Sequence, residues 1–166
     1  MQASSNPVPA TGRPPFAVKE HLMLGIIICG HGGFASGMEQ AMNQILGEQE
    51  AVVAIDFPES STTALLQGQC EAALARVDRG DGVVFLTDLL GGTPFRVAST
   101  LALRQPDREV VTGTNLQLLL EMTMDRGELT PSQFREQALC CGHRGLTSLV
   151  DELARERAES RVEEGI

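Results

Sequence analysis

The stretch 24–37, LGIIICGHGGFASG, constrains the fold more than any other part of this chain. Its first half, 24–29, is a short uncharged run rich in branched side chains, which is typical of a strand buried on both faces of a parallel sheet. The run ends at Gly30, presents His31, and passes through two more glycines into a sequence with helical character. Ligands of open α/β sheets bind beyond the carboxyl ends of the strands, so His31 occupies a position where chemistry is expected.

The rest of the chain alternates between strand and helix patterns. Further strands are predicted at 51–57, 82–88 and 109–112, and helices at 37–46, 62–77, 94–103, 115–124 and 131–141. The helix starts are predicted from capping residues and prolines, namely Ser36, one of Ser60, Ser61 and Thr62, Thr93 before Pro94, Asn115, and Pro131 with Ser132. The alternation predicts an α/β fold, a doubly wound, mostly parallel β-sheet with helices on both faces.

Composition divides the chain into three parts. Residues 1–22 hold four of the eight prolines and show no periodic apolar pattern, so we expect a disordered leader or an extension added upstream. Residues 23–151 are expected to form one folded domain. The charged tail, 152–166, is expected to be a frayed helix or disordered. Before it, GLTSLV at 145–150 is ambiguous between a helical turn and a fifth strand.

Composition also excludes several classes of function. The net charge is −9 and the one lysine, Lys19, lies in the leader. A nucleic-acid partner is therefore not expected, and a P-loop is excluded because its lysine motif is absent. No apolar run reaches the length of a signal peptide core or a membrane span, so we expect a cytoplasmic protein without membrane insertion. The cysteines lack C-x-x-C spacing, which predicts reduced, buried thiols and no metal site: Cys29, Cys70, Cys140 and Cys141.

Two predicted strand ends supply a histidine and an acid. The first strand ends at His31 and the third at Asp88, so both side chains project over the same edge if these strands are neighbours. A carboxylate beside an imidazole accepts the N–H of one ring nitrogen, fixes the tautomer and leaves the other nitrogen as nucleophile or base. We therefore predict that His31 and Asp88 form the catalytic pair.

Two glycine-rich turns converge on this histidine. Gly32 with Gly33, and Gly92 with Thr93, precede predicted helix starts, where backbone N–H groups and the helix dipole favour an anion. Thr93 adds a hydroxyl that can donate a hydrogen bond. We predict a phosphate-binding cradle formed by Gly32, Gly92 and Thr93, with no lysine, metal or other cofactor. The simpler interpretation, in which Thr93 only caps a helix, stays open.

A rival motif is the dinucleotide-binding fingerprint. Residues 30–35, GHGGFA, fit G-x-G-x-x-A and follow a strand, and Asp56 stands at the end of the second strand. The folded part is, however, too short for both a dinucleotide domain and a substrate domain, and a large titratable histidine fills the first variable position. A small dinucleotide-binding module is therefore the less favoured alternative.

Other polar residues are weaker candidates. His143 is either a second functional histidine, a metal ligand with Cys140 and Cys141, or, as we favour, a loop residue near the end of the last helix. Asp56 is either a site residue or a turn acceptor before Pro58. Two further candidates for anion contacts are Arg96 and Arg144.

Four segments together resemble enzyme IIA of the mannose family of the bacterial phosphoenolpyruvate-dependent sugar phosphotransferase system: IIICGHGGFASGMEQAM, ILGEQ, AIDFPE and VFLTDLLGGTPFRVAS. The resemblance covers residues 23 to about 150. Its most specific part is a strand-end histidine followed by glycine, combined with a later F-L-x-D-x-x-G-G-[ST]-P-F. In detail the sequence is most similar to the branch specific for N-acetylgalactosamine or galactosamine. Two features depart from the family, the proline-rich leader and Gly33, where some members carry a bulky side chain.

The resemblance implies a phosphoryl carrier. The histidine matching His31 would accept a phosphoryl group from the histidine-containing phosphocarrier protein and pass it to enzyme IIB, for uptake of an amino sugar such as N-acetylgalactosamine. Asp88 would hydrogen-bond that histidine, and Thr93 would lie beside the phosphoryl group. The family fold implies a homodimer in which a C-terminal strand, here 145–150, crosses to the partner. A related alternative is a phosphohistidine domain that serves a dihydroxyacetone kinase, against which GGTPFRVAS weighs.

Overall fold

The structure is a computed structural model that describes residues 23–163, and the predicted leader lies outside the described residues. The strands are β1 (Gly25–His31), β2 (Val52–Phe57), β3 (Val83–Thr87) and β4 (Arg108–Val111). The helices are α1 (Phe34–Leu46), α2 (Thr63–Val77), α3 (Thr93–Ala102), α4 (Leu116–Asp125), α5 (Pro131–Arg144) and α6 (Leu149–Glu163), with a 3₁₀ turn η1 (Arg126–Glu128) before α5.

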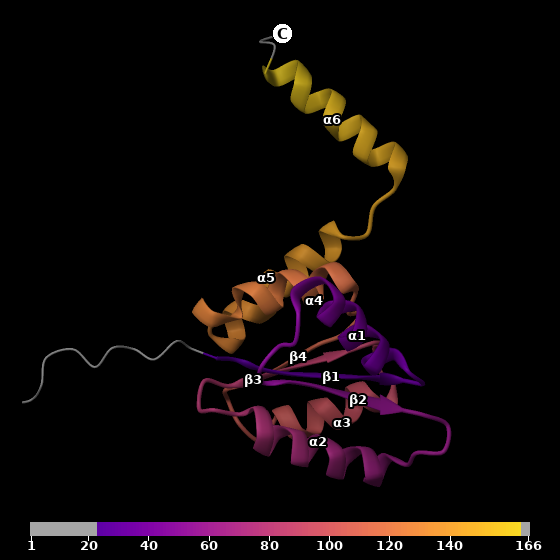
Figure 1. The fold of residues 1–166 in the computed structure, drawn as a ribbon, viewed down its shortest axis with the longest axis vertical. Coiled ribbons are helices and arrows are strands. Elements are labelled where there is room, and N and C mark those ends of the chain that lie inside the picture. Colours follow the sequence, from indigo (N-terminus) through magenta and orange to yellow (C-terminus); the bar gives the residue numbers. More distant parts are fainter. Residues whose placement is uncertain (1–22, 164–166) are drawn as a thin grey trace, which may run out of the picture.

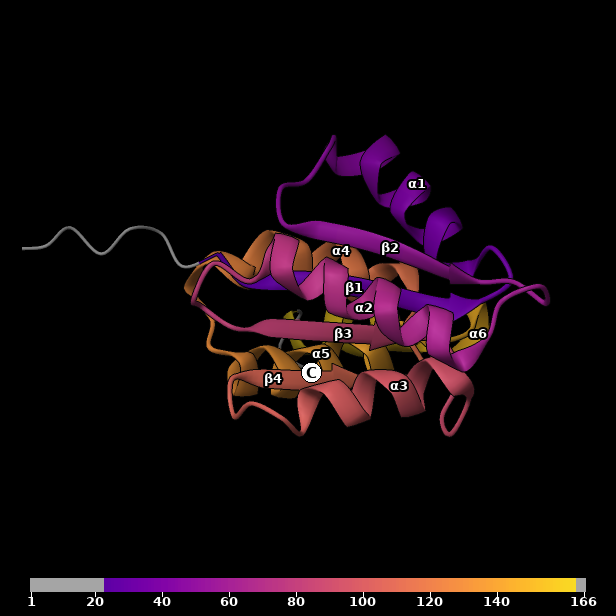
Figure 2. The same ribbon diagram turned by 90° about the horizontal axis from the view of Figure 1, so that it is seen from below.

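The four strands form one sheet in the order β2-β1-β3-β4, and every pairing is parallel. Helices cover both faces, with α1, α4 and α5 on one and α2 and α3 on the other (Figures 1 and 2). The predicted α/β class with a doubly covered sheet is therefore confirmed, and the sheet is wholly parallel rather than mostly so. Parallel strands need such crossover helices, which bury both faces of the sheet.

The central strand β1 divides its side chains between two apolar cores. Ile26 and Ile28 pack in the core under α1, α4 and α5, whereas Ile27 and Cys29 pack in the core under α2 and α3. All four side chains are fully buried. This division follows from the two-residue period of a strand, and it explains why the sequence of β1 is continuously apolar instead of alternating.

The strand order reverses direction between β1 and β3. The chain leaves β1 toward β2 on one side, and then returns through α2 to β3 on the other side. Cys29 pairs with Thr87, so His31 and Asp88 both lie just past this last pair, at the carboxyl edge. Such a switch point leaves a crevice between diverging connections, which is where open α/β sheets bind ligands.

Two predicted helix caps are confirmed. The Thr62 side chain accepts a hydrogen bond from the Leu65 amide at the start of α2, and the Asn115 side chain accepts one from the Leu118 amide at the start of α4. Each satisfies an N–H group that has no acceptor inside its helix.

Two other helix starts differ from the prediction, and a third is confirmed. Gly33, not Ser36, is the N-cap of α1, and Gly92, not Thr93, is the N-cap of α3. Helix α5 begins at Pro131 as predicted, and Thr130 caps it in a reciprocal capping box with Gln133. Helices α1 and α3 therefore begin earlier than expected and bring their first turns closer to the ends of β1 and β3.

Residues 145–163 form no strand within this single chain. Residues 145–148 form a turn and a bend followed by two residues without regular structure, and Leu149 and Val150 begin α6, so the helical interpretation of 145–150 is correct at its end. The predicted frayed or disordered tail is a continuous helix as far as Glu163. Figure 1 shows α6 extending away from the sheet. Within residues 23–163, no helix has the length and apolar character needed to cross a lipid bilayer.

Candidate functional site

His31 and Asp88 are in direct contact at the carboxyl edge of the sheet. The Nδ1 atom of the imidazole lies 2.8 Å from Asp88 Oδ2, and the backbone N–H of His31 donates to the same oxygen at 2.8 Å. The other carboxylate oxygen, Oδ1, accepts the backbone N–H of Leu89 at 2.8 Å. The histidine side chain is 43% exposed and the aspartate 15%. The backbone N–H groups of His31 and Leu89 thus hold the largely buried carboxylate, while the imidazole is open to solvent.

These contacts fix the charge of the carboxylate and the position of the ring proton. Burial raises the pKa of Asp88, but the hydrogen bonds from the backbone and ring of His31 outweigh it, so the pKa lies below its ordinary value. Asp88 is therefore ionised at neutral pH and can only accept hydrogen bonds. Nδ1 must carry the proton that it shares, and in the neutral ring Nε2 keeps the free lone pair.

Two neighbours hold the ring in place from other sides. The Phe57 ring lies edge-on to the imidazole, with 5.7 Å between centroids and 74° between planes. On the Cε1 side the backbone of Gly92 comes so close that a Cβ atom there would lie 2.7 Å from Cε1 and 3.5 Å from Nε2. Gly92 therefore leaves the space in front of Nε2 open. Sequence analysis missed Phe57, whose position beside His31 depends on the β1–β2 register.

The expected cradle of backbone amides differs in detail. The N–H of Gly32 donates to Phe57 O at 2.9 Å and that of Gly92 to Leu89 O at 3.1 Å, so neither is free for an anion in this structure. Gly32 instead supplies the left-handed turn, φ 58°, that links β1 to α1. The Thr93 N–H, in the first turn of α3, has no intrahelical acceptor. Of the three predicted phosphoryl-binding residues, Thr93 is thus the one whose amide can meet an anion.

Asp56 has a structural role at the start of α1. Its Oδ1 accepts the backbone N–H of Ser36 at 2.9 Å, which places a carboxylate at the N-terminus of this helix. A dinucleotide would need that terminus for its pyrophosphate. The negative charge already there argues against the dinucleotide-binding alternative, although residues 30–35 do form the expected strand–turn–helix.

The remaining candidates do not join this site. The expectation that His143 is a loop residue is wrong, because it lies in the last turn of α5, where it lines a separate cavity of about 550 Å³ with Val111 and Asn115. Arg144 is paired with Glu121. Arg96 is exposed on α3. Between Met23 and Glu163, no cluster of three or more histidine, cysteine or acidic side chains could hold a metal ion. The expectation of buried thiols is correct for three cysteines and wrong for Cys140, which is exposed.

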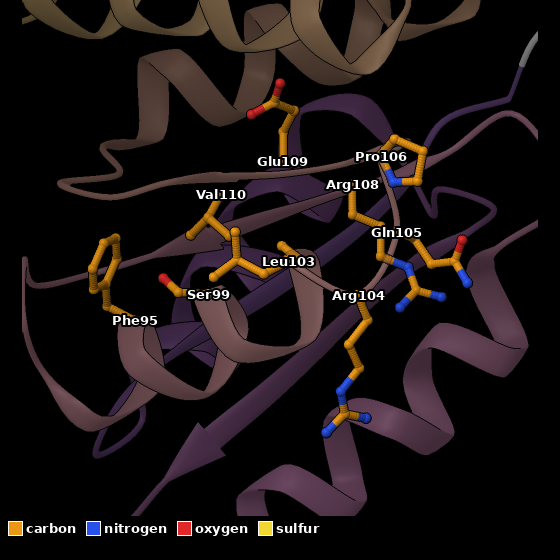
Figure 3. Close-up of a pocket in the computed structure, with 10 residues that line it drawn as sticks. Phe95, Ser99, Leu103, Arg104, Gln105, Pro106, Arg108, Glu109 and Val110 are labelled. Carbon is orange, nitrogen blue, oxygen red and sulfur yellow. The ribbon is translucent and has the colours of Figure 1, made fainter.

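A larger groove, of about 710 Å³, lies away from His31, between α3 and the outer edge strand β4 (Figure 3). Its apolar wall includes Phe95, Leu103 and Val110. The nearby guanidinium groups are occupied, because Arg104 pairs with Glu71 and Arg108 donates to Leu101 O. The groove is thus mainly apolar, and Glu109 at its border is likewise paired, with Arg135.

Comparison with known proteins assigns the chain to a family. The family model described as "PTS system fructose IIA component" matches residues 25–139, where PTS denotes the phosphotransferase system. The fructose-specific EIIA component of Bacillus subtilis strain 168 is 31% identical over 107 residues, 64% of this chain and 73% of that protein. The mannose-specific EIIAB component of Escherichia coli K12 is 36% identical over 107 residues, but this chain spans only 33% of its length.

Solved structures agree with this assignment. The phosphotransferase component EIIA from Streptococcus agalactiae matches with a TM-score of 0.70 and 31% identity, over 78% of this chain and 99% of that one. A IIA protein associated with the fucose utilisation operon of Streptococcus pneumoniae matches with a TM-score of 0.70 and 25% identity, over 78% of this chain and 95% of that one. The family match covers both β1 with His31 and the turn after β3 with Asp88. The chain therefore belongs to the mannose family of enzyme IIA components of the sugar phosphotransferase system.

Proposed function

We propose that this chain is a phosphoryl carrier in which Nε2 of His31 accepts a phosphoryl group from a histidine-containing phosphocarrier protein and passes it to an enzyme IIB. EIIA components as a class are phosphotransferases of sugar uptake that work with these two partners. The observation that carries the proposal is the Asp88 contact to Nδ1, which leaves Nε2 as the one ring nitrogen with a free lone pair. We place the protein in the cytoplasm, where its partners act.

The site has what transfer between two histidines requires. The N–P bond of the donor's phosphohistidine breaks while an N–P bond forms at Nε2, so an imidazole is both nucleophile and leaving group. No proton has to leave His31, because Nδ1–H stays in its hydrogen bond to Asp88 while the ring gains positive charge. Asp88 stabilises that charge and orients the ring. Thr93, through its amide at the start of α3, offers a donor for a phosphoryl oxygen.

The test is the intact mass of the protein after incubation with phosphoenolpyruvate, enzyme I and the phosphocarrier protein. We expect one acid-labile phosphoryl group on the wild type and none on His31→Ala. His143→Ala is the matched control and should still be phosphorylated, since His143 lies at another cavity. A phosphoryl group that survives in His31→Ala, or a wild type that gains none, would contradict the proposal.

The family assignment does not determine which sugar is transported, because the relatives are named for different sugars. They are named for mannose, fructose and sorbose. We propose an amino sugar such as N-acetylgalactosamine, on the sequence resemblance alone. The test reconstitutes phosphoenolpyruvate-dependent sugar phosphorylation with the chain's cognate membrane components. N-acetylgalactosamine should be phosphorylated faster than mannose or fructose, and a preference for either of these would reject the assignment.

We also propose a homodimer in which residues 145–150 of each chain become extended, with the first turn of α6 unwound, and pair with the outer edge of β4 in the other. In residues 23–163 that edge has no strand partner, and the groove beside it presents Leu103 with 88% of its surface exposed. Residues 145–150 carry exposed leucines to match, Leu146 at 87% and Leu149 at 75%. An unpaired edge with an apolar border favours strand addition. Light scattering should show a dimer that Leu146→Asp/Leu149→Asp disrupts, and a monomeric wild type would contradict it.

A further inference from the structure

Two leucines next to the catalytic pair are exposed. Leu89 and Leu90 directly follow Asp88, and 59% and 72% of their surfaces are accessible to solvent. Large apolar side chains are usually buried, since burial stabilises each by about 1.5–3 kcal/mol. These two leucines contribute little to either apolar core, so they are best explained by a contact that the isolated chain does not make.

The turn that carries these leucines is ordered by its own hydrogen bonds. The Leu89 amide donates to Asp88 Oδ1 at 2.8 Å, and the Gly92 amide donates to Leu89 O at 3.1 Å. Gly91, the third residue of this β-turn, has φ 76°, which a type II turn requires. The leucines are therefore held in solvent by backbone geometry, in a fixed relation to Asp88.

The same turn borders the reacting nitrogen. Gly92, at its end, is the residue whose backbone contacts the Cε1 side of the His31 ring beside Nε2. In-line transfer brings the donor nitrogen, the phosphorus and Nε2 into line, with reacting atoms about 3–3.5 Å apart. A protein that delivers its phosphoryl group to Nε2 must then cover the surface around this turn.

The chemistry of this surface indicates the kind of partner. Residues 89–95, LLGGTPF, contain no charged side chain, whereas the chain as a whole carries a net charge of −9. The centre of the contact is therefore apolar, and charged groups such as Arg96 stand further along α3. Interfaces commonly have this form, an apolar centre within a polar rim.

We propose that Leu89 and Leu90 dock the phosphohistidine-bearing donor protein, by contacting an apolar patch around that protein's own reactive histidine. The proposal rests on the proposed function, because it assumes that Nε2 of His31 receives the phosphoryl group from a protein. It adds a recognition role for two side chains that take no part in the chemistry.

The test compares a protein donor with a small one. Transfer to the wild type and to Leu89→Ala/Leu90→Ala is measured with the phosphorylated carrier protein and, separately, with phosphoramidate, which needs no docking surface. We expect the double variant to raise KM for the protein donor by about tenfold with little change in kcat, as loss of central apolar contacts does. Its rate with phosphoramidate should stay within about twofold of wild type.

Ile45→Ala is the matched control. Ile45 is 58% exposed, like Leu89, but it lies near the C-terminal end of α1, at the edge of the sheet opposite to His31. Ile45→Ala should change neither the transfer from the carrier protein nor the transfer from phosphoramidate. An unchanged KM for the protein donor in the double variant overturns the proposal, and so does an equal loss with both donors, which would assign the leucines to support of His31. A wild type that accepts phosphoryl groups from phosphoramidate alone, or from neither donor, contradicts the proposed function itself.

Discussion

Asp88 forms hydrogen bonds with both the backbone and the ring of His31. One oxygen accepts both the amide and the imidazole Nδ1 of His31, and the other accepts the amide of the next residue. This arrangement ties ring orientation to the ends of β1 and β3, so the site's geometry depends on the sheet and not on a mobile side chain. A charged acceptor at Nδ1 also favours the ring as it gains positive charge during transfer.

Replacement of Asp88 by asparagine should therefore slow phosphoryl transfer while the fold stays intact. A neutral side-chain amide cannot supply the charge, and a hydrogen bond to a charged group is worth about 1.5–3 kcal/mol, so we expect a fall in kcat of about 10- to 100-fold. Rapid-quench measurement of phosphoryl transfer to Asp88→Asn, with circular dichroism to check folding, tests this. A transfer rate equal to that of wild type would remove Asp88 from the mechanism.

The lowered pKa of Asp88 also predicts how its contribution to stability depends on pH. A carboxyl group whose pKa is lower in the folded than in the unfolded chain stabilises the fold above its unfolded pKa, and this effect is lost as pH falls through the folded value. The free energy of unfolding of wild type minus that of Asp88→Asn should thus be constant near neutral pH and decline below the ordinary pKa of 3.8. Denaturant unfolding of both proteins between pH 7 and pH 3 measures this difference. If the difference does not change with pH, Asp88 does not have a lowered pKa in the folded chain.

Gly92 should be intolerant of any side chain for steric reasons. A Cβ atom would lie 2.7 Å from His31 Cε1, closer than side-chain atoms approach one another, so the ring must turn away from Asp88 or the turn must shift. Misplacement by about 1 Å can cost about 100-fold in rate, and we expect Gly92→Ala to lose at least that much. The control is Gly37→Ala on α1, where a Cβ meets nothing within 4 Å. If Gly92→Ala transfers normally, the ring is less confined than the structure indicates.

The residues of the site were predictable to different degrees. His31 and Asp88 stand at the ends of clear strand patterns, so their common edge follows from the α/β alternation once the two strands are neighbours. Phe57 could not be found in this way, because its contact with His31 depends on β2 lying on the other side of β1. The sequence also did not show that the Gly32 and Gly92 amides donate to backbone carbonyl groups, since these hydrogen bonds depend on the detailed backbone conformation of the turns.

At the scale of elements, local capping signals predicted some helix starts and missed others. Thr62 and Asn115 cap α2 and α4 through their own side chains, which is a local effect and visible in the sequence. Helix α1 begins earlier than Ser36 because Asp56, twenty residues away in sequence, accepts the Ser36 amide. A long-range acceptor of this kind leaves no local pattern. The start of α5 at Pro131 was predicted correctly from the proline, although the capping box of Thr130 and Gln133, also a local signal, was missed.

This difference between the caps gives a test by mutation. Thr62→Ala removes the acceptor of the Leu65 amide and should lower the free energy of unfolding by about 1 kcal/mol. Ser36→Ala should lower the free energy of unfolding by less than about 0.5 kcal/mol, because the acceptor at the N-terminus of α1 is the Asp56 carboxylate and not the serine hydroxyl. Urea denaturation of both variants compares them directly. A larger loss for Ser36→Ala than for Thr62→Ala would contradict the assignment of the caps.

At the scale of the whole molecule, the four strands could be predicted, with 145–150 left open as a fifth, but their order could not. Each strand and helix has its own apolar period, which a sequence shows directly. The order β2-β1-β3-β4 results from how the crossover helices pack, with α2 and α3 on one face and α1, α4 and α5 on the opposite face (Figure 2). That packing creates the switch point between β1 and β3. The location of the site is thus a property of the whole sheet, although its two reacting residues belong to single strand ends.

Helix α6 stands apart from this arrangement, and its removal should leave the domain intact. It makes few contacts with the sheet or with the other helices, and its side chains are nearly all exposed (Figure 1). A chain that ends at Leu153 keeps residues 145–150 but loses most of α6. We expect its midpoint of thermal unfolding to stay within about 2 °C of the full chain, since about 1 kcal/mol shifts a domain of this size by about 2–4 °C. Differential scanning calorimetry at matched protein concentration measures this shift. A decrease of more than about 5 °C would show that α6 packs against the domain or its dimer partner, and its exposed face would then be an interface.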